Sequence, residues 1–129
     1  MTNEIPITKA TSKRYDLGDR TAKFGVNIVS FVKKISENSV TRPLISQLVR
    51  AGTSVGANYC EADDASTKKD FIYRIGICRK ESKETRYWLG MIAACIPSLV
   101  TETKALSAEA QELNLIFSAI LNRSKKHLD

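Results

Sequence analysis

The residues best suited to chemistry in this sequence are cations that share one side of a predicted helix over residues 68–96. Placed at about 100° intervals around a helical axis, they occupy an arc of about 120°, which we call the basic arc. Its members are Lys68, Lys69, Arg79, Lys80, Lys83 and Arg86. The narrowest group, within about 60°, consists of Lys68, Arg79, Lys83 and Arg86. Such spacing can follow a phosphate backbone, so the basic arc indicates RNA or DNA as a partner.

The basic arc has two other interpretations. Exposed Lys and Arg are common on the solvated face of any long helix. In addition, Asp70, Glu81 and Glu84 form an acidic arc on the same helix, and the basic flank of one subunit can meet the acidic flank of the next. Contacts of this kind are heterologous and close into a ring if the rotation permits. Tyr73 and Tyr87 lie near the basic arc and can stack on bases.

A second set of polar residues lies on the preceding predicted helix. Ser54, Asn58 and Glu61 follow one another at four- and three-residue steps, and Arg50 precedes Ser54 by one turn. We call this set the polar seam. It predicts either a contact with a ligand or nucleic acid, or a hydrogen-bonded network that sets helix register or a subunit interface.

Residues for catalysis or metal binding are scarce. The single histidine is His127, so neither Glu-x-x-His metal pairs nor histidine-based nucleophile schemes can be assembled. Asp63 and Asp64 are adjacent and point about 100° apart on a helix, which disfavours a catalytic pair. We therefore expect no enzyme, no metal and no cofactor.

Composition describes the scaffold that must position these residues. The chain has 129 residues, 43% apolar content and a net charge of +6, which is typical of one small globular domain. The longest apolar run, Met91 to Ile96, is too short for a membrane span, and no secretory signal precedes it. We expect a cytoplasmic protein whose cysteines, Cys60, Cys78 and Cys95, are buried thiols.

Apolar residues recur at alternating four- and three-residue steps in four segments. The first runs from Tyr15 to about Glu37, and the second from an N-cap at Thr41 to about Asp64. The third opens with a Thr67–Asp70 capping box and ends at Pro97, and the fourth runs from about Leu106 and frays into residues 123–126. This pattern predicts an all-α fold, an antiparallel up-down-up-down four-helix bundle over residues 14–127. Residues 1–13 are expected to form a flexible arm.

Gly52 and Gly56 lie within the second segment, in a run of small residues from Ala51 to Asn58. The run lacks the G-x-x-x-x-G-K-[ST] spacing of a phosphate loop. Glycine in a helix interior is destabilising, so two of them predict close approach of another backbone, from the same subunit or a neighbour.

Two runs, Ser54–Ala62 (SVGANYCEA) and Lys80–Leu89 (KESKETRYWL), resemble the bacterial four-helix bundle proteins encoded in 23S rRNA intervening sequences. The resemblance covers about residues 15–125. It implies antiparallel bundles that assemble as homopentameric rings with a basic surface. It also adds Glu84 and Trp88 to the polar seam as positions with structural roles. The similar accessory proteins of diversity-generating retroelements bind nucleic acid and a reverse transcriptase.

Two functions remain open at this point. The first is a non-enzymatic, ring-forming bundle that binds RNA or DNA through phosphate contacts at the basic arc. The second is a protein interaction scaffold, in which the small-residue face and the polar seam are the interfaces. Neither requires a membrane.

Overall fold

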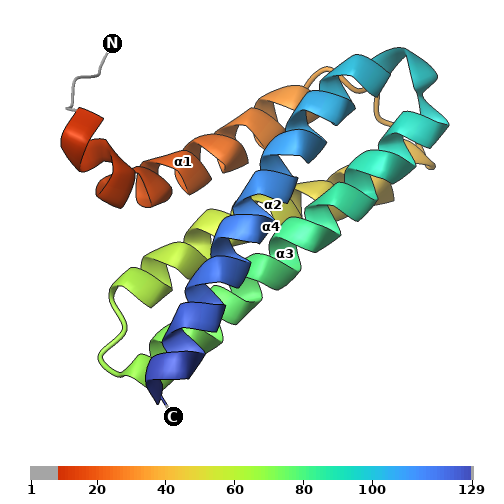
Figure 1. The fold of residues 1–129 in the computed structure, drawn as a ribbon. Coiled ribbons are helices and arrows are strands. Elements are labelled where there is room, and N and C mark those ends of the chain that lie inside the picture. Colours follow the sequence, from red (N-terminus) through yellow and green to blue (C-terminus); the bar gives the residue numbers. More distant parts are fainter. Residues whose placement is uncertain (1–8, 129) are drawn as a thin grey trace.

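The structure, a computed structural model, describes the backbone of residues 9–128 and the side chains of residues 17–126. Four helices account for most of it (Figure 1). They are α1 (Lys9–Val32), α2 (Thr41–Asp63), α3 (Lys68–Cys95) and α4 (Val100–Leu128), with a short 3-10 turn, η1 (Pro97–Leu99), before α4. Within the described backbone there is no strand, so the predicted all-α class is confirmed.

The helices lie lengthwise beside one another, and the chain turns back at each connection (Figure 1). Helix α3 packs mainly against α2 and α4, whereas α1 packs mainly against α2 and touches α4 less. The start of α3 and the end of α4 therefore lie at the same end of the molecule. This packing is compatible with the expected up-down-up-down arrangement.

Several helix boundaries differ from those expected. Helix α1 begins at Lys9, so residues 9–13 of the predicted arm are helical, while its residues 1–8 lie outside the described part of the chain. Helix α1 also ends at Val32 instead of about Glu37. Helix α4 extends from Val100 to Leu128, through the stretch expected to fray, because no glycine or proline interrupts it.

The predicted capping at Thr67 is confirmed, since its side chain accepts a hydrogen bond from the Asp70 N–H at 3.0 Å. The predicted N-cap at Thr41 is wrong. Asn38 caps the start of α2, and its Oδ1 accepts from the N–H groups of Val40 and Thr41, each at 2.9 Å. Thr41 lies inside the helix, where its hydroxyl donates to the Ser36 carbonyl at 2.7 Å.

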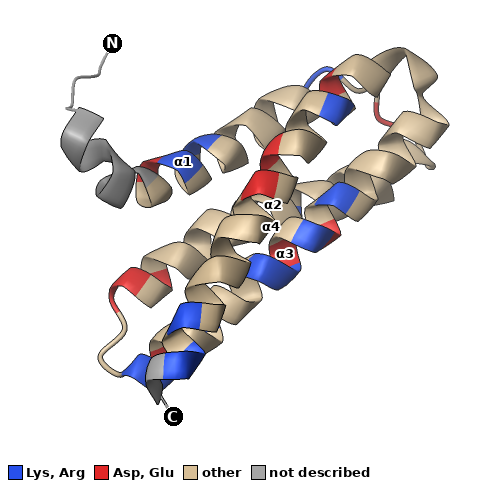
Figure 2. Ribbon diagram, viewed as in Figure 1, with Lys and Arg blue, Asp and Glu red and all other residues tan. Residues whose placement is uncertain are grey.

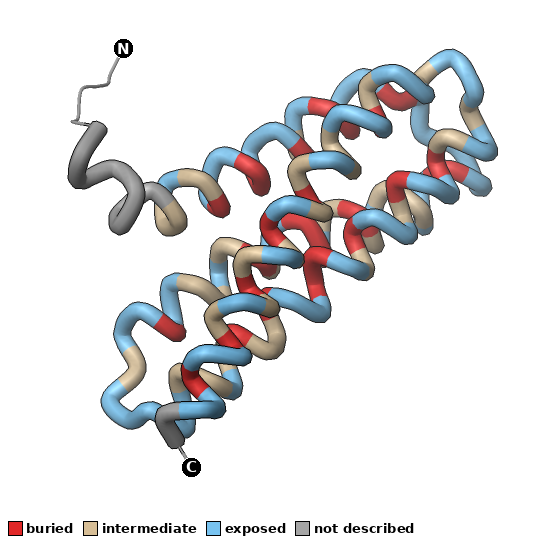
Figure 3. Tube along the Cα trace, viewed as in Figure 1, coloured by how far each residue is buried: buried red, intermediate tan, exposed pale blue. Residues whose placement is uncertain are grey.

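The core contains apolar side chains from all four helices, and the buried positions face inward along each one (Figure 3). The largest fully buried apolar residues are Phe24, Ile28, Leu48, Val55, Ile75, Leu89, Ile92, Leu113 and Phe117. All of these belong to the stripes predicted from the four-three spacing. Burial of this apolar surface is the main favourable contribution to folding.

The expectation of three buried thiols holds for Cys78 alone. Cys60 and Cys95 are exposed, because they lie on the outer surface of α2 and at the end of α3. Burial raises the pKa of the Cys78 thiol to about 12, and its Sγ–H contacts the Val55 carbonyl at 3.5 Å.

The glycines of α2 face α1 of the same chain. A Cβ added to Gly52 would lie 2.8 Å from Cγ1 of Ile28, and one added to Gly56 would lie 3.2 Å from the backbone carbonyl of Thr21. The expected close approach of a second backbone is therefore confirmed at Gly56, where the partner is α1, whereas Gly52 makes room for the Ile28 side chain of α1.

We expect Gly52→Ala to lower the free energy of unfolding by about 1–3 kcal/mol, because the buried Ile28 cannot move away from the new methyl group. Gly76→Ala is the matched control. Nothing lies within 4 Å of a Cβ at Gly76, so alanine there should raise stability by up to about 1 kcal/mol. Urea unfolding measures both, and equal stabilisation by the two alanines would show that α1 does not need this contact.

Candidate nucleic-acid interface

Arg50 of α2 lies against two carboxylates of α3. Its Nη1 donates to both carboxylate oxygens of Glu81, at 3.2 and 3.3 Å, and its Nη2 pairs with Glu84. Glu81 is only 7% exposed, so its charge would be costly without this cation. The indole N–H of Trp88 donates to Glu84 at 3.0 Å. These contacts join α2 and α3 at one register.

The electrostatics follow from these contacts. The hydrogen bond from Trp88 and the charge of Arg50 lower the pKa of Glu84, against the opposing effect of partial burial. Burial acts to lower the pKa of Arg50, but the charges and hydrogen bonds of Glu81 and Glu84 outweigh it and raise that pKa. Arg50 and Glu84 are therefore both charged at neutral pH.

The polar seam continues along α2 toward its C-terminal end. The Ser54 hydroxyl donates to the Arg50 carbonyl at 2.6 Å, and the Asn58 amide donates to the Ser54 carbonyl at 2.9 Å. Arg74 of α3 donates to Oδ1 of Asn58 at 3.1 Å. Arg74 also lies over the ring of Tyr73, 5.6 Å from its centroid.

Five of the six predicted seam residues thus make seam contacts: Arg50, Ser54, Asn58, Glu84 and Trp88. Glu61 is exposed and makes no side-chain hydrogen bond or ion pair among the described residues. Sequence reasoning missed Glu81 and Arg74 as seam partners. Their positions beside Cys78 on the flank of the α3 stripe were the available signal, since that flank must contact a neighbouring helix.

The six cations of the basic arc are all exposed, and Figure 2 shows Lys and Arg positions recurring along α3. Among the side chains of residues 17–126, none of these six forms an ion pair. The ion pairs that do form use other cations, namely Arg20 with Glu109 and Glu112, Lys34 with Glu102, Arg42 with Glu37, and Arg50. Six carboxylates pair with these other cations, and among the described side chains none forms an ion pair with the basic arc.

Contacts with α4 hold one edge of the basic arc in place. Arg86 donates to the side-chain oxygen of Gln111, and the Asn114 amide donates to the Arg79 carbonyl at 3.0 Å. Apart from Arg86, the cations of the basic arc have no side-chain hydrogen bond among the described residues, and the charged groups of these five side chains are exposed to solvent.

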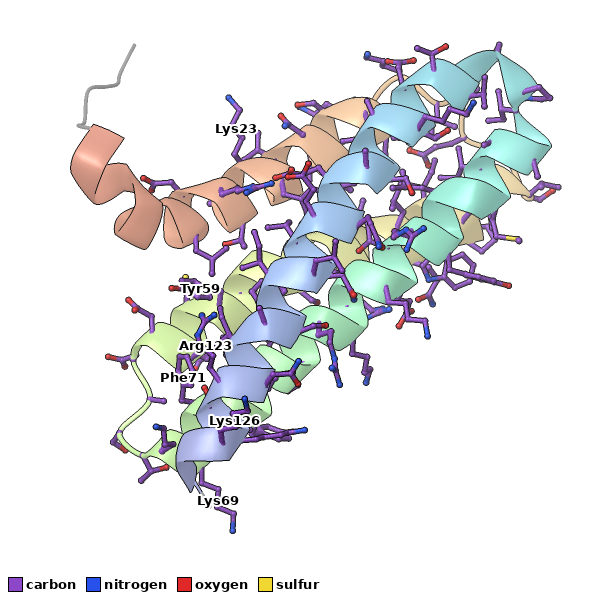
Figure 4. All side chains as sticks on the ribbon, in the orientation of Figure 1. Lys23, Tyr59, Lys69, Phe71, Arg123 and Lys126 are labelled. Carbon is purple, nitrogen blue, oxygen red and sulfur yellow. The ribbon has the colours of Figure 1, made fainter. Side chains whose placement is uncertain are left out.

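Three further cations lie on the last turns of α4: Arg123, Lys125 and Lys126, all exposed. Figure 4 places Lys126 and Arg123 at the same end of the molecule as Lys69. Sequence reasoning missed them because it treated residues 123–126 as a frayed tail. Lys125 lines one groove together with Arg79 and Lys80, and we call the basic arc and Lys125 together the basic face.

The basic face can bind phosphate groups by charge and hydrogen bonding. The described residues include no group of three or more His, Cys, Asp or Glu side chains that could hold a metal ion. No helix in the described part of the chain has both the length and the apolar character needed to span a membrane.

We expect Arg50→Met to lower the free energy of unfolding by about 2 kcal/mol, since Glu81 then stays buried without a cation. Arg42→Met is the matched control, because Arg42 pairs with Glu37 at 3.6 Å on the exposed surface, and it should cost less than about 0.5 kcal/mol. Adding Glu81→Met to Arg50→Met should restore most of the loss. Equal costs for the two arginine variants would contradict the assigned role of Arg50.

Comparison with known proteins gives a consistent family assignment. No curated protein matches the chain. Its fold matches the crystal structure of a protein of unknown function from the S23 ribosomal protein family of Bacteroides thetaiotaomicron, with 29% sequence identity and a TM-score of 0.72. The match covers 81% of this chain and 97% of that one. The family model described as 23S rRNA-intervening sequence protein matches residues 13–119, nearly the whole bundle. The chain therefore belongs to the 23S rRNA-intervening sequence protein family.

Proposed function

We propose that this protein is a non-enzymatic bundle that binds nucleic acid through the phosphate groups, with the basic face as the contact surface. The main support for this proposal is that the basic arc has no ion-pair partner among the described side chains. Four other cations do form ion pairs, namely Arg20, Lys34, Arg42 and Arg50. The net charge of +6 adds a long-range attraction for polyanions. The names of the family and of the structural neighbour refer to ribosomal RNA and ribosomal protein, which favours RNA over DNA.

The dimensions of α3 suit a backbone contact. From Lys68 to Arg86 the helix rises about 27 Å, a length that spans about eight phosphates of one strand in a duplex. Cations of this kind position a nucleic acid without reading its sequence, so we expect affinity to depend on salt more than on base order.

Charge reversal tests this surface. We expect Arg79→Glu together with Lys83→Glu to weaken binding of labelled structured RNA by at least tenfold at low salt, because both cations belong to the basic arc. The slope of log affinity against log salt should also fall by about one per lost phosphate contact. Fluorescence anisotropy over a range of salt concentrations measures both quantities.

Lys23→Glu together with Arg42→Glu is the matched control. Both cations are exposed and lie outside the basic face, Lys23 on α1 (Figure 4) and Arg42 on α2, and the double variant changes net charge by the same amount. It should retain most of the affinity. If both double variants lose affinity for RNA equally, net charge alone would explain the effect and the basic face would not be the contact surface. Binding that does not respond to salt would contradict phosphate contact.

A second surface favours self-association. The outer side of α1 and α2 carries a groove of about 490 Å³, lined mostly by small and apolar side chains that include Ala22, Val26 and Ala57. Val26 is 62% exposed and lies among the small residues of this groove, so the groove presents an apolar side chain to solvent. Family resemblance implies a homopentameric ring, and we propose that a second copy of the chain covers this groove.

We expect Val26→Glu to dissociate the oligomer, since a charge in an apolar interface loses its hydration. Val40→Glu is the matched control, because Val40 is 59% exposed but lies outside the groove. Light scattering should give the wild type and Val40→Glu a mass several times 14.3 kDa, and Val26→Glu a mass near it. A monomeric wild type at high micromolar concentration would contradict self-association. An oligomer that persists in Val26→Glu would leave the groove free for another protein, as the scaffold function requires.

A further inference from the structure

A groove crosses the basic face where α3 passes the C-terminal part of α4. Its volume is about 440 Å³, within the range of sites that hold small molecules. The floor is formed by Gly76 of α3 beside Leu121 of α4, and Tyr73 stands at one side. The lining also includes two apolar residues, Ile72 and Ile77, and three cations, Arg79, Lys80 and Lys125.

Gly76 leaves the floor of this groove open. Nothing lies within 4 Å of the position that its Cβ would occupy, so close packing does not require glycine here, unlike at Gly52. A glycine inside a helix lowers stability because it costs backbone entropy. In return for this loss of stability, the missing side chain of Gly76 leaves space in the groove that Tyr73 and the three cations line.

Tyr73 offers an aromatic surface at the edge of this space. Its side chain is 62% exposed, and the Arg74 guanidinium lies 5.6 Å from the ring centroid. Arg74 is in turn held by Asn58 of α2 at 3.1 Å. The polar seam therefore supports the residue that contacts the ring, and a pre-positioned ring loses less conformational entropy when it binds.

We propose that this groove holds one unpaired nucleotide, with its base stacked on Tyr73 above Gly76 and its phosphates against Arg79, Lys80 and Lys125. Aromatic rings stack on bases of any sequence, and cations beside them hold the backbone. A base within a duplex is already stacked and cannot enter. The proposal rests on the proposed function and adds that the basic face prefers single-stranded nucleic acid.

A second groove on the same helix provides an internal comparison. It surrounds Gly90, has a volume of about 230 Å³ and includes Arg86 and Lys104. No aromatic side chain lines it. Tyr87, which precedes Gly90 by three residues as Tyr73 precedes Gly76, packs edge-on against Trp88 with the centroids 4.9 Å apart. Nothing lies within 4 Å of a Cβ at Gly90 either.

The test fills each groove with the same side chain. We expect Gly76→Leu to weaken binding of fluorescein-labelled dodecauridylate about tenfold, the effect of losing one stacked base. Gly90→Leu should bind like the wild type. Neither variant removes a cation, so the salt dependence should not change. Tyr73→Ser should match Gly76→Leu, and Tyr73→Phe should match the wild type. Thermal unfolding followed by circular dichroism confirms that each variant is folded.

The choice of probe separates stacking from charge. An abasic chain with the same number of phosphates, and a twelve-base-pair duplex, should bind wild type and Gly76→Leu equally. If Gly76→Leu binds dodecauridylate as well as the wild type while Arg79→Glu with Lys83→Glu does not, the nucleotide groove is wrong and the phosphate-binding function stands. Equal losses in Gly76→Leu and Gly90→Leu would also overturn the groove. No binding by the wild type at low salt would overturn both proposals.

Discussion

The carboxylate of Glu81 is nearly enclosed between α2 and α3, and this buried charge constrains much of the structure. A carboxylate in such a position requires a cation with good hydrogen-bond geometry, and Arg50 provides one from α2. The pairing fixes how α2 lies along α3, and the same guanidinium also takes up Glu84. Because Arg50 engages both carboxylates from the α2 side, neither of them forms an ion pair with a cation of the basic arc.

The other ion pairs between helices have the same consequence. Arg20 joins α1 to Glu109 of α4 at 2.7 Å, and Lys34, in the turn after α1, pairs with Glu102 near the start of α4. Each pair uses carboxylates to connect helices, so charge is distributed unevenly over the surface. Close contact of α1 with the glycines of α2 completes the bundle and leaves the apolar groove on the outer side. The ion pairs and close contacts between the helices thus determine where the basic face and the apolar groove lie.

Local patterns predicted the helices well, because burial of one face imposes the four-three spacing that Phe24, Leu48, Ile75 and Leu113 all follow. The cap at Thr67 was predictable, since it depends on residues three positions apart. The cap at Asn38 was not predictable, because Asn and Thr are both common N-cap residues. Only the geometry of the turn shows that Asn38, and not Thr41, accepts the hydrogen bonds from the first backbone N–H groups of α2. The sequence alone predicted which cations share one side of α3. Its lack of ion-pair partners depends on contacts such as Arg50 with Glu81, which join residues 31 positions apart.

The groove at Gly76 was unpredictable for a similar reason. It requires Leu121 and Lys125, which α4 brings alongside α3.

NMR mapping of amide chemical shifts in the wild-type protein, with dodecauridylate added at low and then at high salt, tests whether α3 and the end of α4 bind nucleic acid through its phosphates. We expect shifts on α3 between residues 68 and 86 and at the end of α4, and we expect these shifts to reverse at high salt. Shifts confined to α1 and α2, or unaffected by salt, would contradict it.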